Sequence, residues 1–505
     1  MNTPAIATSY ETVIGLEIHV QLLTASKMFC ACPVTFGAPP NTLICPVCLG
    51  LPGSLPVLNR KAVDLGLRTA VALGCTAQPT SQFHRKNYYY PDLPKNYQIT
   101  QYRYKVHPPL ATDGSLEIPR EGNPVPDGTG RQPAPSDAGR RRIGVRRVHL
   151  EEDTGRLVHA EQHGRIRYSL IDFNRSGVPL MEIVTEPELR SPQEARTFLV
   201  LLRAVLQAIE VSTGKMEEGS LRCDANVSLR RPGADLGIRT EVKNMNSLRS
   251  VERALAYEVE RQRAVLDRGQ PVEQETRHWD ERRGITFSSR TKEEAQDYRY
   301  FPEPDLVPIA VAPQWVAEVR ASLPELPEVK RRRYVETYGL PEYDAELLTS
   351  SAAMARFFEE TVRLFPHPKA ACNWLVGDIT AYLNAAGKEI DELPVTPAHL
   401  AELLQLVERG AISGRTAKEI VAEMLAQGRR PEVIVGERGL AQISDEEALA
   451  RIVDEVLAEH TGPVSEYRAG RTQALTFLVG QVMKKTRGRA NPEMANRLLR
   501  EKLRS

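Results

Sequence analysis

Acidic and imidazole side chains recur on one face of several short predicted strands that lie far apart in the chain. In TVIGLEIHVQL, Glu17 and His19 alternate with apolar residues, and RVHLEED and SLRCDANVSLR repeat this alternation around Glu151 and Asp224. Glu, His, Asp, Asn and Arg on the wet face of a strand are the groups that hold a hard cation and a polyphosphate. The pattern therefore predicts the floor of a metal-assisted phosphoryl-transfer site.

One cation site is expected within this pattern. Glu17, His19 and Glu151 are its first candidates, and Glu182 in PLMEIVTE could join them. Mg²⁺ takes oxygen ligands and keeps several of its waters, and one histidine among carboxylates would also suit Mn²⁺. The alternative is that Glu17 and His19 line an ordinary solvated strand face. Recurrence of the pattern in several segments of one domain favours a site.

A nucleotide would have to bind here without a glycine-rich phosphate loop. The Gly214-Lys215 pair lacks the upstream glycine and the following Ser or Thr of a P-loop, and no kinase-type glycine loop occurs. We therefore expect side chains of the sheet to hold the phosphates. The candidates are Lys86, Lys95, Asn96, Arg222, Asp224, Asn226, Lys243 and Asn244, each of which could also be an ordinary surface residue.

Four of the seven cysteines form a C-x-C pair and a C-x-x-C pair with twelve residues between them. These are Cys30, Cys32, Cys45 and Cys48. Two short thiolate pairs joined by a loop can close a tetrahedron around zinc, and four thiolates leave no open position for catalysis. We therefore expect a structural Zn²⁺ site. The alternative is four unligated or oxidised thiols, although oxidation is disfavoured in a cytosolic chain.

A basic run follows an apolar helical pattern near the C-terminal end. Between Thr476 and Ser505, eight Lys and Arg residues stand against two Asp and Glu residues. Four of these cations are Lys484, Lys485, Arg487 and Arg489. We expect a local phosphate-binding surface for RNA, and the alternative is a solvated helix end whose cations complement the helix dipole.

Composition excludes some broad classes. The chain has 505 residues, of which 41% are hydrophobic and 26% charged, as in globular proteins. Lys and Arg number 66 against 65 Asp and Glu, so net charge alone indicates no nucleic-acid partner. No apolar run approaches the ~20 residues of a membrane helix. The first residues, MNTPAIATSY, lack the features of a signal or transit peptide, so we expect a cytoplasmic protein with no membrane partner.

The order of predicted elements indicates the α+β class. We expect a largely antiparallel sheet domain with flanking helices over 1–295, an all-α helical domain over 296–400 and a small α-helical tail domain over 401–505. In the first domain, Ser191 predicts a helix N-cap, and Glu194 completes a capping box. The Pro- and Gly-rich segment 111–142 predicts a long surface loop between two strands.

Motifs along nearly the whole chain resemble one protein family. They are GLEIHVQL, the two cysteine pairs, NYYYPDLPKNYQITQY, HLEEDTGR, NRSGVPLMEIVTEP, GSLRCDANVSLR, TEVKNMNS, TKEEAQDYRYFPEPDL and LVGQVMKKTRGRANP. In this order they look like the B subunits of bacterial aspartyl/glutamyl-tRNA(Asn/Gln) amidotransferases. The archaeal E-type relative carries a synthetase-like insertion, for which the sequence has no room between 180 and 400.

The resemblance implies a reaction. A cradle domain would bind the acceptor end of a misacylated tRNA, Glu-tRNA(Gln) or Asp-tRNA(Asn), and the helical and tail domains would contact the tRNA body. ATP with Mg²⁺ would phosphorylate the side-chain carboxylate of the attached amino acid. Ammonia released by a glutaminase A subunit would then displace the phosphate. A small C subunit would complete a heterotrimer, and the sequence leaves open whether the cognate aminoacyl-tRNA synthetase joins it.

The resemblance also assigns roles to residues of this chain. Glu17, His19, Glu151 and Glu182 would bind the catalytic Mg²⁺, and the four cysteines would form a zinc knuckle. Lys86, Tyr88 and Lys95 would lie near an ammonia tunnel or the phosphate site. A competing interpretation is a non-catalytic module that only positions tRNA, because such a module needs no more than the cysteines and the basic tail.

Overall fold

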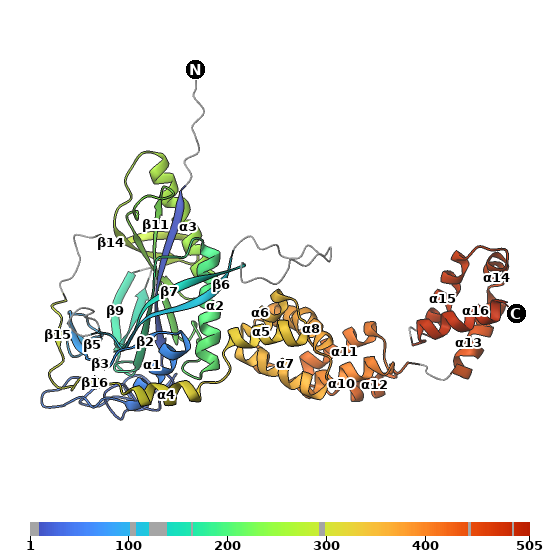
Figure 1. The fold of residues 1–505 in the computed structure, drawn as a ribbon, viewed down its shortest axis with the longest axis horizontal. Coiled ribbons are helices and arrows are strands. Elements are labelled where there is room, and N and C mark those ends of the chain that lie inside the picture. Colours follow the sequence, from blue (N-terminus) through green and yellow to red (C-terminus); the bar gives the residue numbers. More distant parts are fainter. Residues whose placement is uncertain are drawn as a thin grey trace, which may run out of the picture. The chain divides into compact units, whose positions relative to one another are not determined.

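The computed structural model describes residues 10–101, 108–120, 139–162, 165–291, 298–442, 446–486 and 489–504. The chain divides into two compact units, Met1–Pro327 and Glu328–Ser505 (Figure 1). The first unit contains the sheet and its helices, and the second is helical. This confirms the α+β prediction. The domain limits near 295 and 400 stay predictions.

A mixed sheet of twelve described strands forms the first unit, in the order β14-β13-β12-β11-β1-β10-β7-β5-β4-β15, with β6 beside β7 and β2 beside β6. Its strands are β1 (Glu11–Gln21), β2 (Thr76–Ala77), β4 (His84–Asn87), β5 (Tyr97–Thr100), β6 (Ala111–Pro119), β7 (Arg140–Glu152), β10 (Pro179–Thr185), β11 (Leu221–Arg230), β12 (Thr240–Met245), β13 (Glu275–Asp280), β14 (Ile285–Thr291) and β15 (Phe301–Pro302). Among these described strands, β12 and β13 run parallel and the other pairs are antiparallel. Two smaller sheets pair β3 (Thr80–Ser81) with β16 (Ile309–Ala310) and β8 (Arg156–Gln162) with β9 (Arg165–Asp172).

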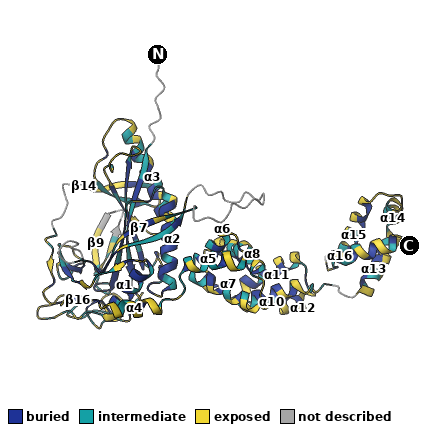
Figure 2. Cartoon of the chain, in the orientation of Figure 1, coloured by how far each residue is buried: buried dark blue, intermediate teal, exposed yellow. Residues whose placement is uncertain are grey.

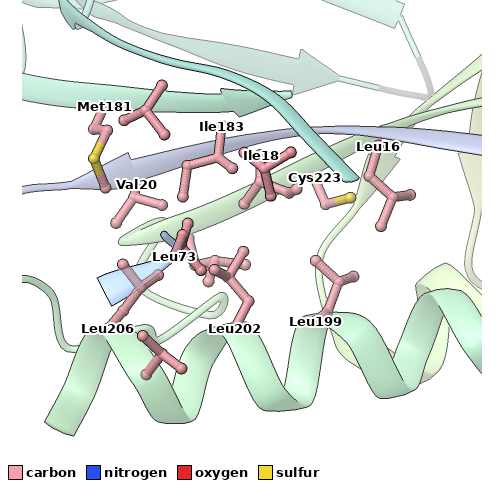
Figure 3. Close-up of a cluster of buried hydrophobic side chains, with 14 of the residues drawn as sticks. Leu16, Ile18, Val20, Leu73, Met181, Ile183, Leu199, Leu202, Leu206 and Cys223 are labelled. Carbon is pink, nitrogen blue, oxygen red and sulfur yellow. The ribbon is translucent and has the colours of Figure 1, made fainter. Parts of the chain in front are cut away.

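Helices cover the apolar face of the large sheet. They are α1 (Arg60–Ala72), α2 (Pro192–Ala208) and α3 (Leu248–Asp267), and α4 (Pro313–Ser322) packs against α1. The strand residues Leu16, Ile18, Val20, Met181, Ile183 and Cys223 face Leu199, Leu202 and Leu206 of α2 (Figure 3). The alternation predicted for β1 is confirmed, since its apolar residues are buried while Glu17 and His19 are half-buried. Figure 2 colours the whole chain by burial. The polar face of the sheet is thereby left for other contacts.

The start of α2 confirms one half of its predicted capping box. The Ser191 hydroxyl accepts a hydrogen bond from the Glu194 N–H at 3.0 Å. The Glu194 carboxylate, however, accepts from the N–H of Arg190 at 2.7 Å and from the Arg141 guanidinium at 2.6 Å. The nearby arginine therefore draws this carboxylate away from the usual second bond of a capping box.

The prediction of one long loop over 111–142 is wrong at both ends. Residues from Ala111 to Pro119 form β6, which pairs with β7 from Val148 back to Arg140. Residues 121–138 lie outside the described part of the chain. Gly114 marks a close approach here rather than a turn, because a Cβ at this position would lie 2.2 Å from the Cys75 sulfur. The high content of Gly and Pro led to the prediction of a loop where β6 pairs with β7.

The second unit has two separate apolar cores. The described helices are α5 (Pro327–Tyr338), α6 (Glu342–Thr349), α7 (Ala352–Leu364), α8 (Pro368–Trp374), the π-helical η3 (Leu375–Ile379), α9 (Thr380–Ala386), the 3₁₀ helix η4 (Ile390–Glu392), α10 (Pro397–Glu408), α11 (Gly414–Gln427), α12 (Pro431–Arg438), α13 (Glu446–Glu459), α14 (Thr461–Arg468), α15 (Gln473–Lys485) and α16 (Pro492–Arg504). One core extends from Tyr334 to Val435 and the other from Leu449 to Leu503. Of the helices described in the whole chain, none is long and apolar enough to cross a bilayer.

Candidate functional site

Neighbouring strands bring His19, Glu151 and Glu182 together on the polar face of the large sheet. His19 of β1 stands opposite Glu182 of β10, and β10 pairs in turn with β7, which carries Glu151. The His19 Nε2 atom lies 3.5 Å from an oxygen of Glu151 and 3.5 Å from an oxygen of Glu182. One ligand atom from each residue lies within 4.8 Å of the others. Two carboxylates and one imidazole at this spacing could hold a divalent cation.

The electrostatics of this group favour a positive charge between its carboxylates. Burial alone would lower the pKa of His19, but the hydrogen bond to Glu182 and the charges of Glu151 and Glu182 raise it to about 9. Burial would raise the pKa of Glu182, but His149 and His19 hold it well below its usual value. Glu182 is thus held ionised by neighbouring positive charge, which a bound metal ion could supply in place of a proton.

Glu17 does not join this group. It stands on the same face of β1, opposite Asp224 of β11, and its carboxylate accepts a hydrogen bond from the Asn226 amide at 3.1 Å. Burial, followed by the charges of Glu182 and Glu241, raises the pKa of Glu17. Of the four candidate cation ligands, the structure therefore brings three together and leaves Glu17 beside them.

Three residues that were not predicted complete the surroundings of the group. His149 Nε2 lies 3.2 Å from the Glu182 carboxylate, and Arg147 Nη2 lies 3.3 Å from it. The Thr100 hydroxyl donates to Glu151 at 3.2 Å. Arg147 and His149 lie within RVHLEED on the same face as Glu151, so alternation indicated their position, but their contact with Glu182 of β10 depends on strand pairing.

Predicted phosphate-binding residues on β11 and β12 lie on the same polar face. Arg222 stands opposite His19 and contacts the Asp153 carboxylate at 2.7 Å. Lys243 contacts Asp224 at 2.5 Å and Glu241 at 3.0 Å. Arg222 thus lies next to His19 and Lys243 lies two strands away from it, each bound to a carboxylate. A polyphosphate would compete with these carboxylates for the cations.

Two of the predicted asparagines have backbone roles. Asn96 and Asn244 both have positive φ, at 61° and 67°. Asparagine tolerates this left-handed conformation better than most residues. The Asn244 amide also donates to the carbonyl of Trp279 at 3.1 Å, across to β13. Asn96 lies in the turn before β5, and Asn244 lies in β12 where the register with β11 shifts, so local backbone conformation accounts for both residues.

Lys86 and Lys95 lie in different surroundings. The Lys86 ammonium lies 4.9 Å from the ring centroid of Tyr298 and 5.6 Å from that of Tyr88. Lys95 forms a buried ion pair with Glu152, whose carboxylate also accepts from the N–H of Ile99 at 3.0 Å. Lys95 and Glu152 line a cavity of about 210 Å³ that is also lined by Cys30 and Cys48.

The four cysteines converge on one point. The sulfur atoms of Cys30, Cys32, Cys45 and Cys48 lie within 4.8 Å of one another. The Cys48 sulfur accepts from the N–H of Cys45 at 3.1 Å and from the ammonium of Lys27 at 3.6 Å. A hydrogen bond from Cys30, opposed by burial and assisted by these two donors, lowers the pKa of Cys48 to about 4.

The surroundings of Lys27 indicate that this cluster carries negative charge. The Lys27 side chain is fully buried, and its acceptors are the Cys48 sulfur and the Phe173 carbonyl at 3.4 Å. A buried ammonium requires a compensating anion. Four thiolates around Zn²⁺ carry a net negative charge, so the residues present fit a structural zinc ion.

The basic run near the C-terminal end is partly neutralised. Lys485, the last residue of α15, contacts Glu455 at 2.8 Å and Glu459 at 2.6 Å. Arg489 donates to the Thr486 carbonyl at 3.3 Å. Lys484 has no ion-pair partner among the described residues, and Arg487 lies outside them. Fewer cations are available for an RNA than the sequence alone suggests.

Comparison with known proteins finds similar sequences along nearly the whole chain. A family model described as the GatB/GatE catalytic domain matches residues 12–317, and one described as the GatB domain matches residues 356–503. The B subunit of the aspartyl/glutamyl-tRNA(Asn/Gln) amidotransferase of Moorella thermoacetica is 55% identical over 98% of this chain and 100% of its own length. The protein of the same name from Carboxydothermus hydrogenoformans is 51% identical over 98% and 99%. That from Thermosynechococcus vestitus is 52% identical over 99% and 98%.

Proposed function

This chain belongs to the GatB/GatE family, among the B subunits of aspartyl/glutamyl-tRNA(Asn/Gln) amidotransferases, and from this we propose that it carries the kinase and transamidase site. Its substrates would be Glu-tRNA(Gln), Asp-tRNA(Asn) or both, together with ATP. The observation that carries the proposal is the convergence of His19, Glu151 and Glu182 beside Arg222 and Arg147 on one sheet face.

The reaction needs two steps because a carboxylate repels nucleophiles. In the first, a side-chain oxygen of the tRNA-bound Glu or Asp attacks the terminal phosphorus of ATP, which forms an acyl phosphate and releases ADP. In the second, the nitrogen of ammonia attacks the acyl carbon, the bond from carbon to the phosphate oxygen breaks, and inorganic phosphate leaves with that electron pair. The amide nitrogen gives up one proton.

The residues of the site would supply position and charge, which account for most catalysis of phosphoryl transfer. His19, Glu151 and Glu182 would hold Mg²⁺. A bound divalent ion would offset the negative charge of the phosphates. Arg222 and Arg147 would contact phosphate oxygens, and a carboxylate left free by the metal could accept the proton from the amine.

The remaining parts of the chain would serve delivery and assembly. The cavity between Lys95, Glu152 and the cysteines is a candidate stretch of the path for ammonia, and Lys86 with Tyr88 is a second. The cysteine cluster would hold Zn²⁺ in a structural role. A glutaminase A subunit would supply the ammonia, a C subunit would complete the complex, and Lys484 with its neighbours would contact the tRNA body.

Replacing Glu151 with Gln tests the proposal, because it removes one charge while keeping the size of the side chain. In the assembled enzyme we expect amide formation to fall by about 10²-fold or more, with tRNA affinity unchanged. The matched control is Glu186→Gln, since this carboxylate is bound to the exposed Arg146 instead. Unchanged amide formation in Glu151→Gln would favour the module that only positions tRNA.

A further inference from the structure

A row of side chains on the polar face continues beyond the three-residue group toward the edge of the sheet. Glu17 of β1 stands opposite Asp224 of β11, and the Asp224 carboxylate contacts Lys243 of β12 at 2.5 Å. Lys243 stands opposite His278 of β13, which stands opposite Phe287 of β14. Residues that stand opposite one another share a face of the sheet. The row therefore crosses five adjacent strands.

The end of this row is an aromatic surface. The rings of His278 and Phe287 meet edge to face, with centroids 5.9 Å apart and planes at 69°. Trp279, the next residue of β13, is buried in the core, so His278 points to the opposite, polar face. Phe287 is 43% exposed, a large value for an apolar side chain. In the described part of the chain, neither ring nitrogen of His278 has a hydrogen-bond partner.

Along the row, the side chains suit in turn the phosphates, the ribose and the base of a nucleotide. The cation ligands and arginines suit phosphates, and the oxygens of Asp224 suit ribose hydroxyls, as acidic residues do in dinucleotide sites. The His278 ring is suited to stacking because burial and the charge of Lys243 lower its pKa, which leaves it neutral at pH 7. From β1 to β13 there are three strand spacings, roughly 14 Å, which the phosphates and ribose can span.

We propose that His278 and Phe287 form the base-binding surface for an adenosine group, with Asp224 and Lys243 beneath its ribose. The proposal rests on the function proposed above and adds the nucleoside half of the same site. Two ligands of that reaction carry this group: ATP and the 3′-terminal adenosine of the tRNA. Stacking on aromatic rings recognises the base in either case.

The test compares ligands with and without a base in the assembled full-length enzyme. The probes are a non-hydrolysable ATP analogue with Mg²⁺, inorganic tripolyphosphate with Mg²⁺, and tRNA acceptor hairpins with and without the terminal adenosine. The variant is His278→Ala combined with Phe287→Ala. His460→Ala with Phe477→Ala is the matched control, because these rings also meet edge to face, at 5.5 Å, and Phe477 is 46% exposed.

Loss of the rings should weaken the base-bearing ligand roughly 5- to 150-fold, the range for stacking of one base. If the ATP analogue weakens and tripolyphosphate does not, the adenosine is that of ATP. If the complete hairpin weakens and the shortened one does not, it is that of the tRNA. Phe287→Tyr with His278 intact should keep the affinity, and circular dichroism should match that of the unaltered enzyme.

Equal affinities of the variant and the unaltered enzyme for every probe would overturn this inference. That result would leave the proposed function standing if Glu151→Gln still abolishes amide formation. Absence of any Mg²⁺-dependent binding of the ATP analogue to the unaltered enzyme would overturn the proposed function and the assignment of this surface to ATP.

Discussion

Lys27 offers a sharp test of the charge on the cysteine cluster. Its ammonium is fully buried and lies 3.6 Å from the Cys48 sulfur. Lys27→Met keeps most of the side-chain volume and removes the charge. At an effective dielectric constant of about 20, two unit charges at this separation attract by about 4 to 5 kcal/mol.

Part of this attraction is offset in the folded protein. Burial of the ammonium away from water costs several kcal/mol, so the net contribution of Lys27 is smaller than the Coulomb energy. Replacing a residue that supports metal ligands without binding the metal typically weakens metal binding by about 10- to 100-fold. We expect the dissociation constant of zinc in Lys27→Met to rise by that factor.

Competition with a chromophoric chelator in reducing buffer measures this constant. Lys61→Met is the control, because its side chain is 58% exposed and contacts Asp64 rather than a cysteine. Zinc affinity should be unchanged in the control. If Lys27→Met binds zinc as tightly as the unaltered protein, the cluster does not need the ammonium, and the argument for a negatively charged four-thiolate site fails.

Three further substitutions test the packing and charge of the two units by thermal and urea unfolding. Gly114→Ala should destabilise the first unit by about 1–3 kcal/mol because its Cβ would overlap the Cys75 sulfur, whereas Gly377→Ala, in the second unit and with open space around it, should not destabilise that unit. Arg85→Ala should destabilise it by about 3–5 kcal/mol, since the fully buried Glu303 carboxylate would lose its guanidinium partner. Burial alone would raise the pKa of Glu359, but its cationic partners lower it below 4.5. The ionised Glu359 should therefore stabilise the folded second unit above that pH, and this contribution should be lost as the pH falls. A shallower acid dependence in Glu359→Gln would confirm this, and an unaltered one would contradict it.

The sequence predicts well which face of a strand a side chain is on, and poorly which residues of other strands become its neighbours. Period-two alternation correctly separated Leu16 and Ile18 from Glu17 and His19 because face depends only on local geometry. Which acid lies next to His19 depends on register, which hydrogen bonds between distant segments determine. That is why Glu182 joined the group while Glu17, two residues from His19, did not.

Other departures have the same physical origin. The segment 111–142 contains so much Gly and Pro that it resembled a loop, yet Gly114 is needed for packing against Cys75. The basic run around Lys485 resembled a free cationic surface, yet acids of α13, remote in sequence, contact it. A local pattern does not show which distant residues contact a segment, so composition alone predicted too long a loop and too many free cations.

The position of β1 in the middle of the large sheet has a consequence for motion. The ladder to β11 engages one edge from Glu11 to Val20, and the ladder to β10 engages the other edge from Glu17 to Gln21, so His19 is held on both sides. His19 therefore cannot leave its neighbours unless these ladders open, and such opening requires most of the unit to unfold. Backbone amides of β1 should be among the slowest in the protein to exchange hydrogen for deuterium. A substrate bound at the proposed site would then meet a rigid floor, and any closing movement would have to come from segments around it.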